Sequence, residues 1–436
     1  MNRLKRRASL FVILLSLTLI TTGCWGRRET DELAYILALG IDKGEENVNK
    51  VTFQIAIPSA LAGDGEGGDK ATEIISVEAA SLFGAVQLAD IFFSRELTFM
   101  HNEMIVVSAE IAQEGLDKFI NPLIRSRDIR RNAIVAVTQG SAAELLKNNQ
   151  ESLEKNPVRQ FALSMEKAEF TGLTLKTSLN EFSKRAKSPG SSPVLTLIGV
   201  GQTGKEKDVD SEGNGGVKES NAPVAHYKTY PEKIYTETSY LPGEIMREGG
   251  NKTEFIGLAA FRGEHLVGYL NGTETRFYQM ITNKFRDADF TISDPEEEEK
   301  AIIVKIQKRR NPTIKVDLNG EQPEIKVKIC LEGEILSIQS GINYENPQKL
   351  GELEGLIEEN FTDGLMDLIR KSQVEFKSDI FGFGEESRRN FWTWPEWVQY
   401  NWAEKYPTAN VQLDVNLEIR RTGLMNKTAP VSEEGP

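Results

Sequence analysis

The sequence predicts a multidomain α+β protein in which mixed and antiparallel β-sheets pack with helices, after a cleaved lipoprotein signal peptide. Three observations predict this class. The 436 residues are 39% hydrophobic and 27% charged, as in folded globular proteins. Strand-type and helix-type patterns alternate up to residue 200, and strand-type alternation dominates after residue 226. A short apolar run at the amino terminus ends in a cysteine.

The first 24 residues have the pattern of a signal peptide. Four basic residues precede an apolar run at 10–20, which is too short to cross a bilayer. Small residues and Cys24 follow, as in a bacterial lipobox, although Thr21 stands where leucine is usual. We predict cleavage before Cys24, so that 1–23 is the signal peptide and Cys24 is the lipidation site. The alternative is an ordinary secretory signal with a chance cysteine.

Charge narrows the class of partner. The net charge of −13 argues against nucleic acid, which requires clustered Lys and Arg. Cleavage would remove four cations and no anions, which leaves −13 − 4 = −17. Anionic headgroups would repel such a body, so we expect the diacylglycerol and acyl chains on Cys24, and not charge, to hold it at the membrane.

The segment 24–200 is predicted to be an N-terminal mixed α/β domain, because strand and helix signals alternate along it. Pro122 could kink or end the second of its helices, and Ser141 with Glu144 forms a capping box for the third. The expected elements are strands at 35–41, 51–57, 74–77, 104–107 and 134–138, helices at 79–94, 109–124 and from 141, and a glycine-rich loop at 60–70.

The rest of the chain begins with a polar segment, 201–226, that is predicted to be a flexible linker or loop because it has too few apolar residues to form a core. A middle β-rich domain at 227–290, with a turn at Asn271-Gly272, and a C-terminal α+β domain at 291–421 are expected next. The latter combines alternating runs at 302–307, 313–318, 325–331, 333–339 and 410–420 with a long helix at 350–374. The tail, 422–436, is predicted to be disordered.

The sequence contains few candidates for catalytic, metal-binding or cofactor-binding residues. The glycines of 199–205 match a dinucleotide or phosphate loop, but a polar linker follows where such a loop needs a helix. His101, His226 and His265 lack zinc-ligand spacing, and Cys330 is interpreted as a buried, inert thiol. We therefore predict no catalytic residue, no metal site and no cofactor.

Tryptophan is concentrated near the carboxyl terminus. Trp392, Trp394, Trp397 and Trp402 fall within eleven residues. They could form a docking patch for a partner or a bilayer, since Trp favours interfaces. We favour the other interpretation, in which a short helix starting at Pro395 packs its indoles into the core.

Several motifs, taken in order, resemble those of the Ger(x)C spore germination lipoproteins, the C subunits of GerA-type nutrient germinant receptors. The resemblance covers nearly the whole mature chain. The matching segments are 24–29, 33–42 (LAYILALGID), 94–97 with Phe99 and His101, 114–115, 127–131, 255–270 (FIGLAAFRGEHLVGYL), 379–384 (DIFGFG), Trp397 and Trp402.

The resemblance implies a non-enzymatic protein that is lipid-anchored on the outer face of the spore inner membrane. It implies assembly and signalling during germination with two integral-membrane receptor subunits as partners. Cys24 is the one residue whose role transfers, as the lipidation site. The alternative function is an extracytoplasmic lipoprotein that itself binds a small nutrient.

Overall fold

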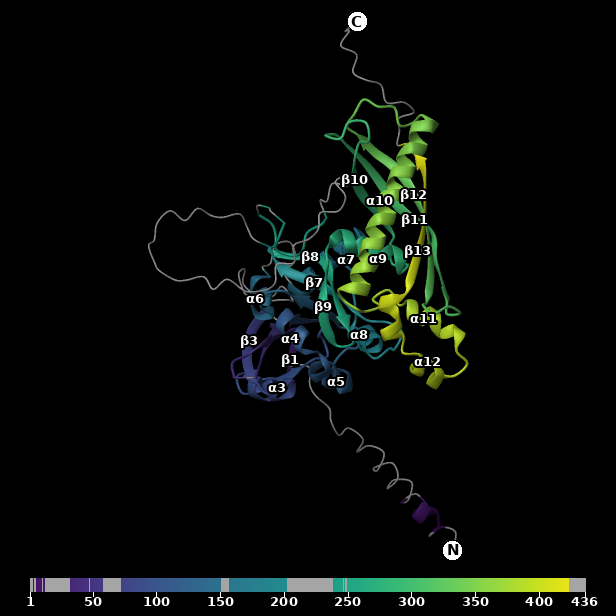
Figure 1. Cartoon of the computed structure of the whole chain (residues 1–436). Coiled ribbons are helices and arrows are strands. Elements are labelled where there is room, and N and C mark those ends of the chain that lie inside the picture. Colours follow the sequence, from purple (N-terminus) through teal and green to yellow (C-terminus); the bar gives the residue numbers. More distant parts are fainter. Residues whose placement is uncertain are drawn as a thin grey trace.

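The computed structural model describes residues 32–422, with gaps at 47, 58–71, 150–156, 202–237, 246 and 248, and a few residues before residue 12. Cys24, the predicted loop at 60–70, nearly all of the predicted linker at 201–226 and the tail lie outside the described residues. Within the described part, helices pack on two β-sheets (Figure 1). The predicted α+β class with mixed and antiparallel sheets is confirmed.

The larger sheet has nine strands in the order β3-β2-β1-β5-β6-β7-β8-β9, with β4 beside β1. Its central strands β1, β5, β6 and β7 are parallel to one another, whereas β2, β3, β8 and β9 add antiparallel edges. The strands are β1 (Leu33–Lys43), β2 (Asn49–Ala56), β3 (Thr72–Ala79), β4 (Glu96–Thr98), β5 (Met104–Ser108), β6 (Ile134–Thr138), β7 (Val194–Val200), β8 (Thr253–Arg262) and β9 (His265–Leu270).

Helices cover both faces of this sheet, which explains why its central strands are nearly continuous apolar runs. The helices α3, α4, α5 and α8 contribute to one core, and α6 and α7 contribute to another on the opposite face. These helices are α3 (Leu82–Asp90), α4 (Ala109–Glu114), α5 (Asp117–Arg125), α6 (Ala142–Asn148), α7 (Pro157–Phe170) and α8 (Leu179–Ala186).

Two details differ from the prediction for this region. The predicted helix at 109–124 is two helices, and the break lies at Gly115 and not at Pro122, which stays inside α5. Gly115 has φ +115°, and a Cβ there would lie 2.7 Å from the His265 ring. Ser141 is the N-cap of α6 as predicted, since its hydroxyl accepts the N–H of Glu144 at 3.3 Å. The addition is Asp42 of β1, whose carboxylate accepts the backbone N–H groups of Ala142 and Ala143 at 2.7 and 2.9 Å.

The smaller sheet has four strands in the order β10-β11-β12-β13. The four predicted runs at 302–339 are two long strands interrupted by bulges, and β13, the predicted strand at 410–420, runs parallel to β12. The predicted long helix is confirmed as α10, which packs its apolar stripe on this sheet. The elements are β10 (Asp287–Ser293), β11 (Ala301–Asp317), β12 (Glu324–Ile338), α10 (Pro347–Val374) and β13 (Asn410–Arg421).

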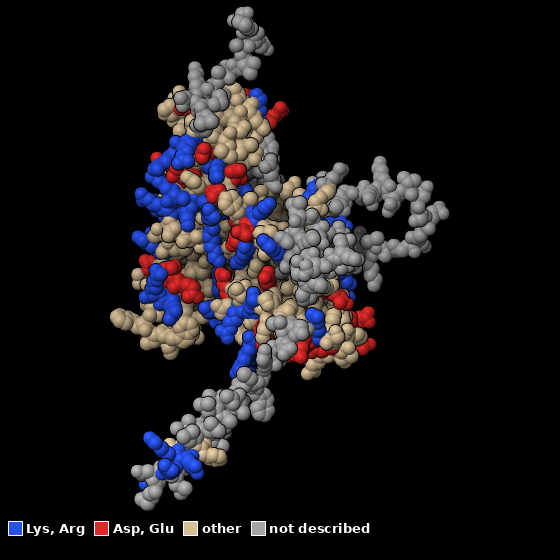
Figure 2. Space-filling view, turned by 180° about the vertical axis from the view of Figure 1, so that it is seen from behind, with Lys and Arg blue, Asp and Glu red and all other residues tan. Residues whose placement is uncertain are grey.

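The face of this sheet that points away from α10 is basic. Lys326 and Lys328 alternate along β12 with buried Ile325, Val327 and Ile329. Figure 2 shows Lys and Arg gathered over this face. Cys330 shares the face and is half-buried, so the expectation of a buried thiol was wrong.

A helix that the sequence did not predict lies between the two sheets. Asn271-Gly272, expected as a turn, starts α9 (Gly272–Ile281), and Asn271 and Glu274 form its capping box. Every residue of α9 is buried. The described residues of 227–290 therefore do not form a sheet of their own: β8 and β9 belong to the larger sheet, α9 is helical, and β10 belongs to the smaller sheet.

Candidate functional site

The segment 379–384 lies where the two halves of the chain meet. The Asp379 side chain accepts hydrogen bonds from the backbone N–H groups of Gly382 and Gly384, both at 2.8 Å, and from Nε1 of Trp402 at 2.9 Å. Its backbone oxygen accepts the N–H of Ser192 at 2.7 Å, which ties the segment to the chain just before β7. We call this network the Asp379 junction.

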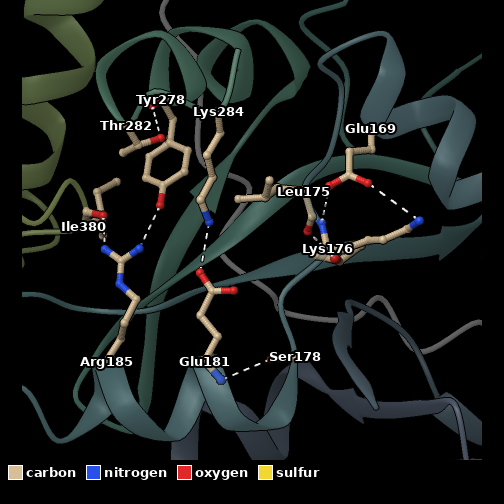
Figure 3. Close-up of polar contacts among 11 residues, drawn as sticks. Glu169, Leu175, Lys176, Ser178, Glu181, Arg185, Tyr278, Thr282, Lys284 and Ile380 are labelled. Carbon is tan, nitrogen blue, oxygen red and sulfur yellow. Dashed lines mark hydrogen bonds and ion pairs between the residues drawn. The ribbon is translucent and has the colours of Figure 1, made fainter. Parts of the chain in front are cut away.

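Arg185 of α8 extends the Asp379 junction from the side of the larger sheet (Figure 3). Its guanidinium donates to the backbone oxygen of Ile380 at 2.5 Å and to the Tyr278 hydroxyl of α9 at 3.1 Å. One turn earlier on α8, Glu181 forms an ion pair with Lys284 at 2.9 Å. The helix thus contacts both the C-terminal region and the end of α9.

Two glycines let the backbones approach closely at the Asp379 junction. A Cβ on Gly384 would lie 2.5 Å from the carbonyl oxygen of Gly190 and 2.5 Å from Cδ1 of Trp402. A Cβ on Gly190 would lie 3.0 Å from the Trp397 ring. The glycines at both positions are therefore required by space, because larger residues would force the two segments apart.

Burial shifts the pKa values of two side chains at the Asp379 junction. Burial raises the pKa of Asp379, and the hydrogen bonds from Gly384, Trp402 and Gly382 oppose that rise by stabilising the charged form. Burial also raises the pKa of Tyr406 well above its ordinary value. The donors around Asp379 are two backbone N–H groups and the Trp402 indole, so this arrangement joins the segment 379–384 to α13.

The structure separates the four clustered tryptophans into two pairs. Trp397 of α12 (Trp394–Tyr400) and Trp402 of α13 (Trp402–Lys405) are 2% and 1% exposed, as the core interpretation requires. Trp392 and Trp394 are 97% and 52% exposed, so that interpretation was wrong for them.

Other predicted residues remain apart from the Asp379 junction. His101 makes an edge contact with the Tyr35 ring, and His265 lies near the backbone of Gln113. Gly199 and Gly201 pack closely on Pro242 and Glu254. His226 and Cys24 lie outside the described residues.

Two other kinds of site, a metal centre and a membrane-spanning helix, are absent from the described residues. Among them, no three His, Cys, Asp or Glu side chains are grouped as metal ligands would be. Of the helices that the structure describes, none has both the length and the apolar composition of a membrane span.

Sequence reasoning missed Arg185 and Tyr278. They lie 93 residues apart, and Arg185 reaches Ile380 across 195 residues. Arg185 stands in an ordinary amphipathic helix, and α9 was not expected at all. The motif at 379–384 was the available signal, since Gly382 has φ +84° and Gly384 has no room for a side chain.

Comparison with known proteins places the chain in a family. Residues 26–200 match the family model described as "Spore germination protein N-terminal domain", and residues 256–423 match "Spore germination B3/ GerAC like, C-terminal". Spore germination protein KC of Bacillus subtilis (strain 168) is 24% identical over 430 residues, covering 97% of each chain. Spore germination protein B3 of the same organism is 20% identical, covering 97% of this chain and 100% of the relative.

A solved structure has a similar fold. The crystal structure of the GerBC protein matches with a TM-score of 0.50 and 15% sequence identity, and the match covers 87% of this chain and 96% of that chain. The family matches together extend over both sheets and over the Asp379 junction between them. The chain therefore belongs to the GerAC-like family of spore germination proteins.

Proposed function

We propose that this protein is a non-catalytic subunit of a spore nutrient germinant receptor, lipid-anchored through Cys24 on the outer face of the spore inner membrane. It acts there in assembly and signalling with two integral-membrane subunits. The observation that carries the proposal is the end-to-end match to spore germination proteins, which covers 97% of this chain and 97% of the KC protein.

The anchor is tested by a matched pair of cysteine variants in spores. Cys24→Ala removes the acylated thiol, whereas Cys330→Ala removes the half-buried thiol of β12. We expect Cys24→Ala to leave the inner-membrane fraction and to impair the germination response to nutrients, because the acyl chains supply the attachment. Cys330→Ala should leave both unchanged. A normal response and normal membrane recovery in the Cys24→Ala spores would refute the proposal.

The partners are tested by purification. The lipidated protein, solubilised from spore membranes, should co-purify with two integral-membrane subunits in fixed proportion. Recovery of the protein alone, combined with calorimetric binding of a germinant amino acid or sugar to it, would favour the alternative of a nutrient-binding lipoprotein.

A further inference from the structure

The amino ends of the parallel strands lie along one edge of the larger sheet. Met104, the first residue of β5, pairs with Ile134, the first residue of β6. Strand β1 extends further in the same direction and starts at Leu33, which pairs with Glu96 of β4. The chain from Cys24 therefore enters the folded body at this edge. We call the surface made by residues 88–103 and 125–133 the amino edge.

The amino edge carries a cluster of exposed apolar side chains. Leu88 is 43% exposed, Ile91 75%, Phe92 69% and Met100 43%. The turn that carries Ile91 and Phe92 is fixed, since Asp90 accepts the backbone N–H of Leu97 at 2.9 Å. Exposed apolar residues are normal when they are scattered, but a cluster indicates an interaction site.

Basic side chains stand on the loop that leads into β6, whose first residue lies at the same edge of the sheet. Arg125 ends α5, and Arg127, Arg130 and Arg131 follow on the loop into β6, all with exposed side chains. Buried Ile129 anchors the loop, at 4% exposed. These seven residues hold four cations and one anion, Asp128, and such an excess of positive charge attracts anionic headgroups.

The exposed tryptophans lie at the same end of the molecule. Trp397 packs against Gly190, which lies just before β7, so α12 belongs to this end of the larger sheet. Figure 1 draws α3, α5 and α12 at one end, opposite the end where β13 finishes. Trp392 and Trp394 are exposed there, and Trp is enriched at membrane interfaces.

The short length of chain between Cys24 and the first strand indicates what covers the amino edge. Nine Cα–Cα steps separate Cys24 from Leu33, and an extended chain spans about 3.5 Å per residue, so Leu33 stays within roughly 30 Å of a lipid on Cys24. We propose that the amino edge rests on the bilayer, with Ile91 and Phe92 in the headgroup–acyl boundary and the arginines on lipid phosphates. This inference rests on the lipid anchor of the proposed function.

Site-specific fluorescence tests the orientation. Phe92→Cys and Leu336→Cys are made in the lipidated full chain with Cys330→Ala, and each carries a polarity-sensitive probe. Leu336 is the matched control: it is 48% exposed, and it lies near Glu334, which pairs with Arg421 at the far end of the smaller sheet. The proteins are reconstituted in vesicles of phosphatidylcholine and phosphatidylglycerol that contain acyl-chain nitroxide lipids.

We expect the nitroxide lipids to quench the probe at position 92 and to leave the probe at position 336 bright. Arg127→Gln with Arg130→Gln should weaken quenching at position 92 in the phosphatidylglycerol vesicles but not in pure phosphatidylcholine, because each basic residue near an anionic surface changes membrane binding by about fivefold.

Equal quenching at the two positions would overturn the proposal. Quenching or protection at position 92 that occurs only when the integral-membrane subunits are present would also overturn it, because the amino edge would then bind protein. Flotation with vesicles separates this inference from the proposed function. A lipidated chain that does not float refutes the anchor and the orientation together, whereas flotation without quenching at position 92 refutes the orientation alone.

Discussion

The buried carboxylate of Asp379 is stabilised by the groups that donate hydrogen bonds to it. Trp402→Phe keeps an aromatic ring in place but removes the Nε1–H that lies 2.9 Å from the carboxylate. We expect the free energy of unfolding to fall by about 1–3 kcal/mol, the usual cost of a buried acceptor that loses a partner. Urea denaturation measures the loss, and Trp394→Phe is the matched control because Trp394 is 52% exposed. An equal loss in both variants would contradict this role for Trp402.

The same carboxylate makes stability depend on pH. Because burial raises the pKa of Asp379 in the folded protein, the folded state holds a proton that the unfolded state has lost in the pH range between the two pKa values. The contribution of Asp379 to the free energy of unfolding therefore falls as pH rises from the pKa of the unfolded state through the raised pKa of the folded state. Trp402→Phe removes a bond to the charged form and so raises the folded-state pKa of Asp379 further. The destabilisation should therefore grow as pH rises through the folded-state pKa of the unmodified protein. A loss independent of pH, in urea titrations from acidic to neutral pH, would contradict this.

Glycines at two positions of α10 should respond in opposite directions to the same substitution. A Cβ on Gly355 meets nothing within 4 Å, whereas a Cβ on Gly364 would collide with the Phe277 ring of α9. Gly355→Ala should stabilise by about 0.5–1 kcal/mol through the unfolded chain. Gly364→Ala should destabilise by about 1–3 kcal/mol because it overpacks the contact between the helices. Thermal unfolding of the two variants measures both effects, and shifts of the same sign would contradict this packing.

Helix α10 and helix α9 show how far the sequence could predict the elements. The apolar stripe of α10, including Leu353, Ile357 and Phe361, has helical spacing and is buried as expected. Helix α9 is buried on every side although half of its residues are polar, Glu274 and Arg276 among them, so no contrast between an apolar and a polar face marks it as a helix. Asn271 begins it as an N-cap, a role that the Asn-Gly dipeptide shares with turns.

The pairing of strands is the second feature that the sequence predicted only in part. The alternating runs of β11 and β12 were recognised, but the sequence did not show that each pair of runs is one strand, joined across bulges in β11 and through the regularly paired Glu332 in β12. The parallel neighbour β13 also escaped prediction, since alternation fixes which face is buried and not the direction of the partner. Cys330 was misplaced for a related reason: it lies on the lysine face of β12, opposite the buried side chains around it.

The whole molecule is joined by contacts between residues far apart in sequence. The largest core cluster contains Leu258 and Leu270 of the larger sheet together with β10–β13, α9 and α10. The Asp379 junction adds the polar contact of Arg185 with Ile380. Pattern reasoning treats segments one at a time, so it could identify the motif at 379–384 but not what that motif contacts.

This shared core predicts that the two sheets unfold together. In urea, tryptophan fluorescence reports mainly on the C-terminal region, where four of the five tryptophans lie at 392–402. Far-UV circular dichroism reports on both sheets. We expect the two signals to give one transition with the same midpoint, because a core that both sheets build cannot be lost by one alone. Gly384→Ala, which forces the backbone away from Gly190, should lower both midpoints by the same amount. A fluorescence transition that separates from the dichroism transition, in either protein, would show that the sheets are independent units.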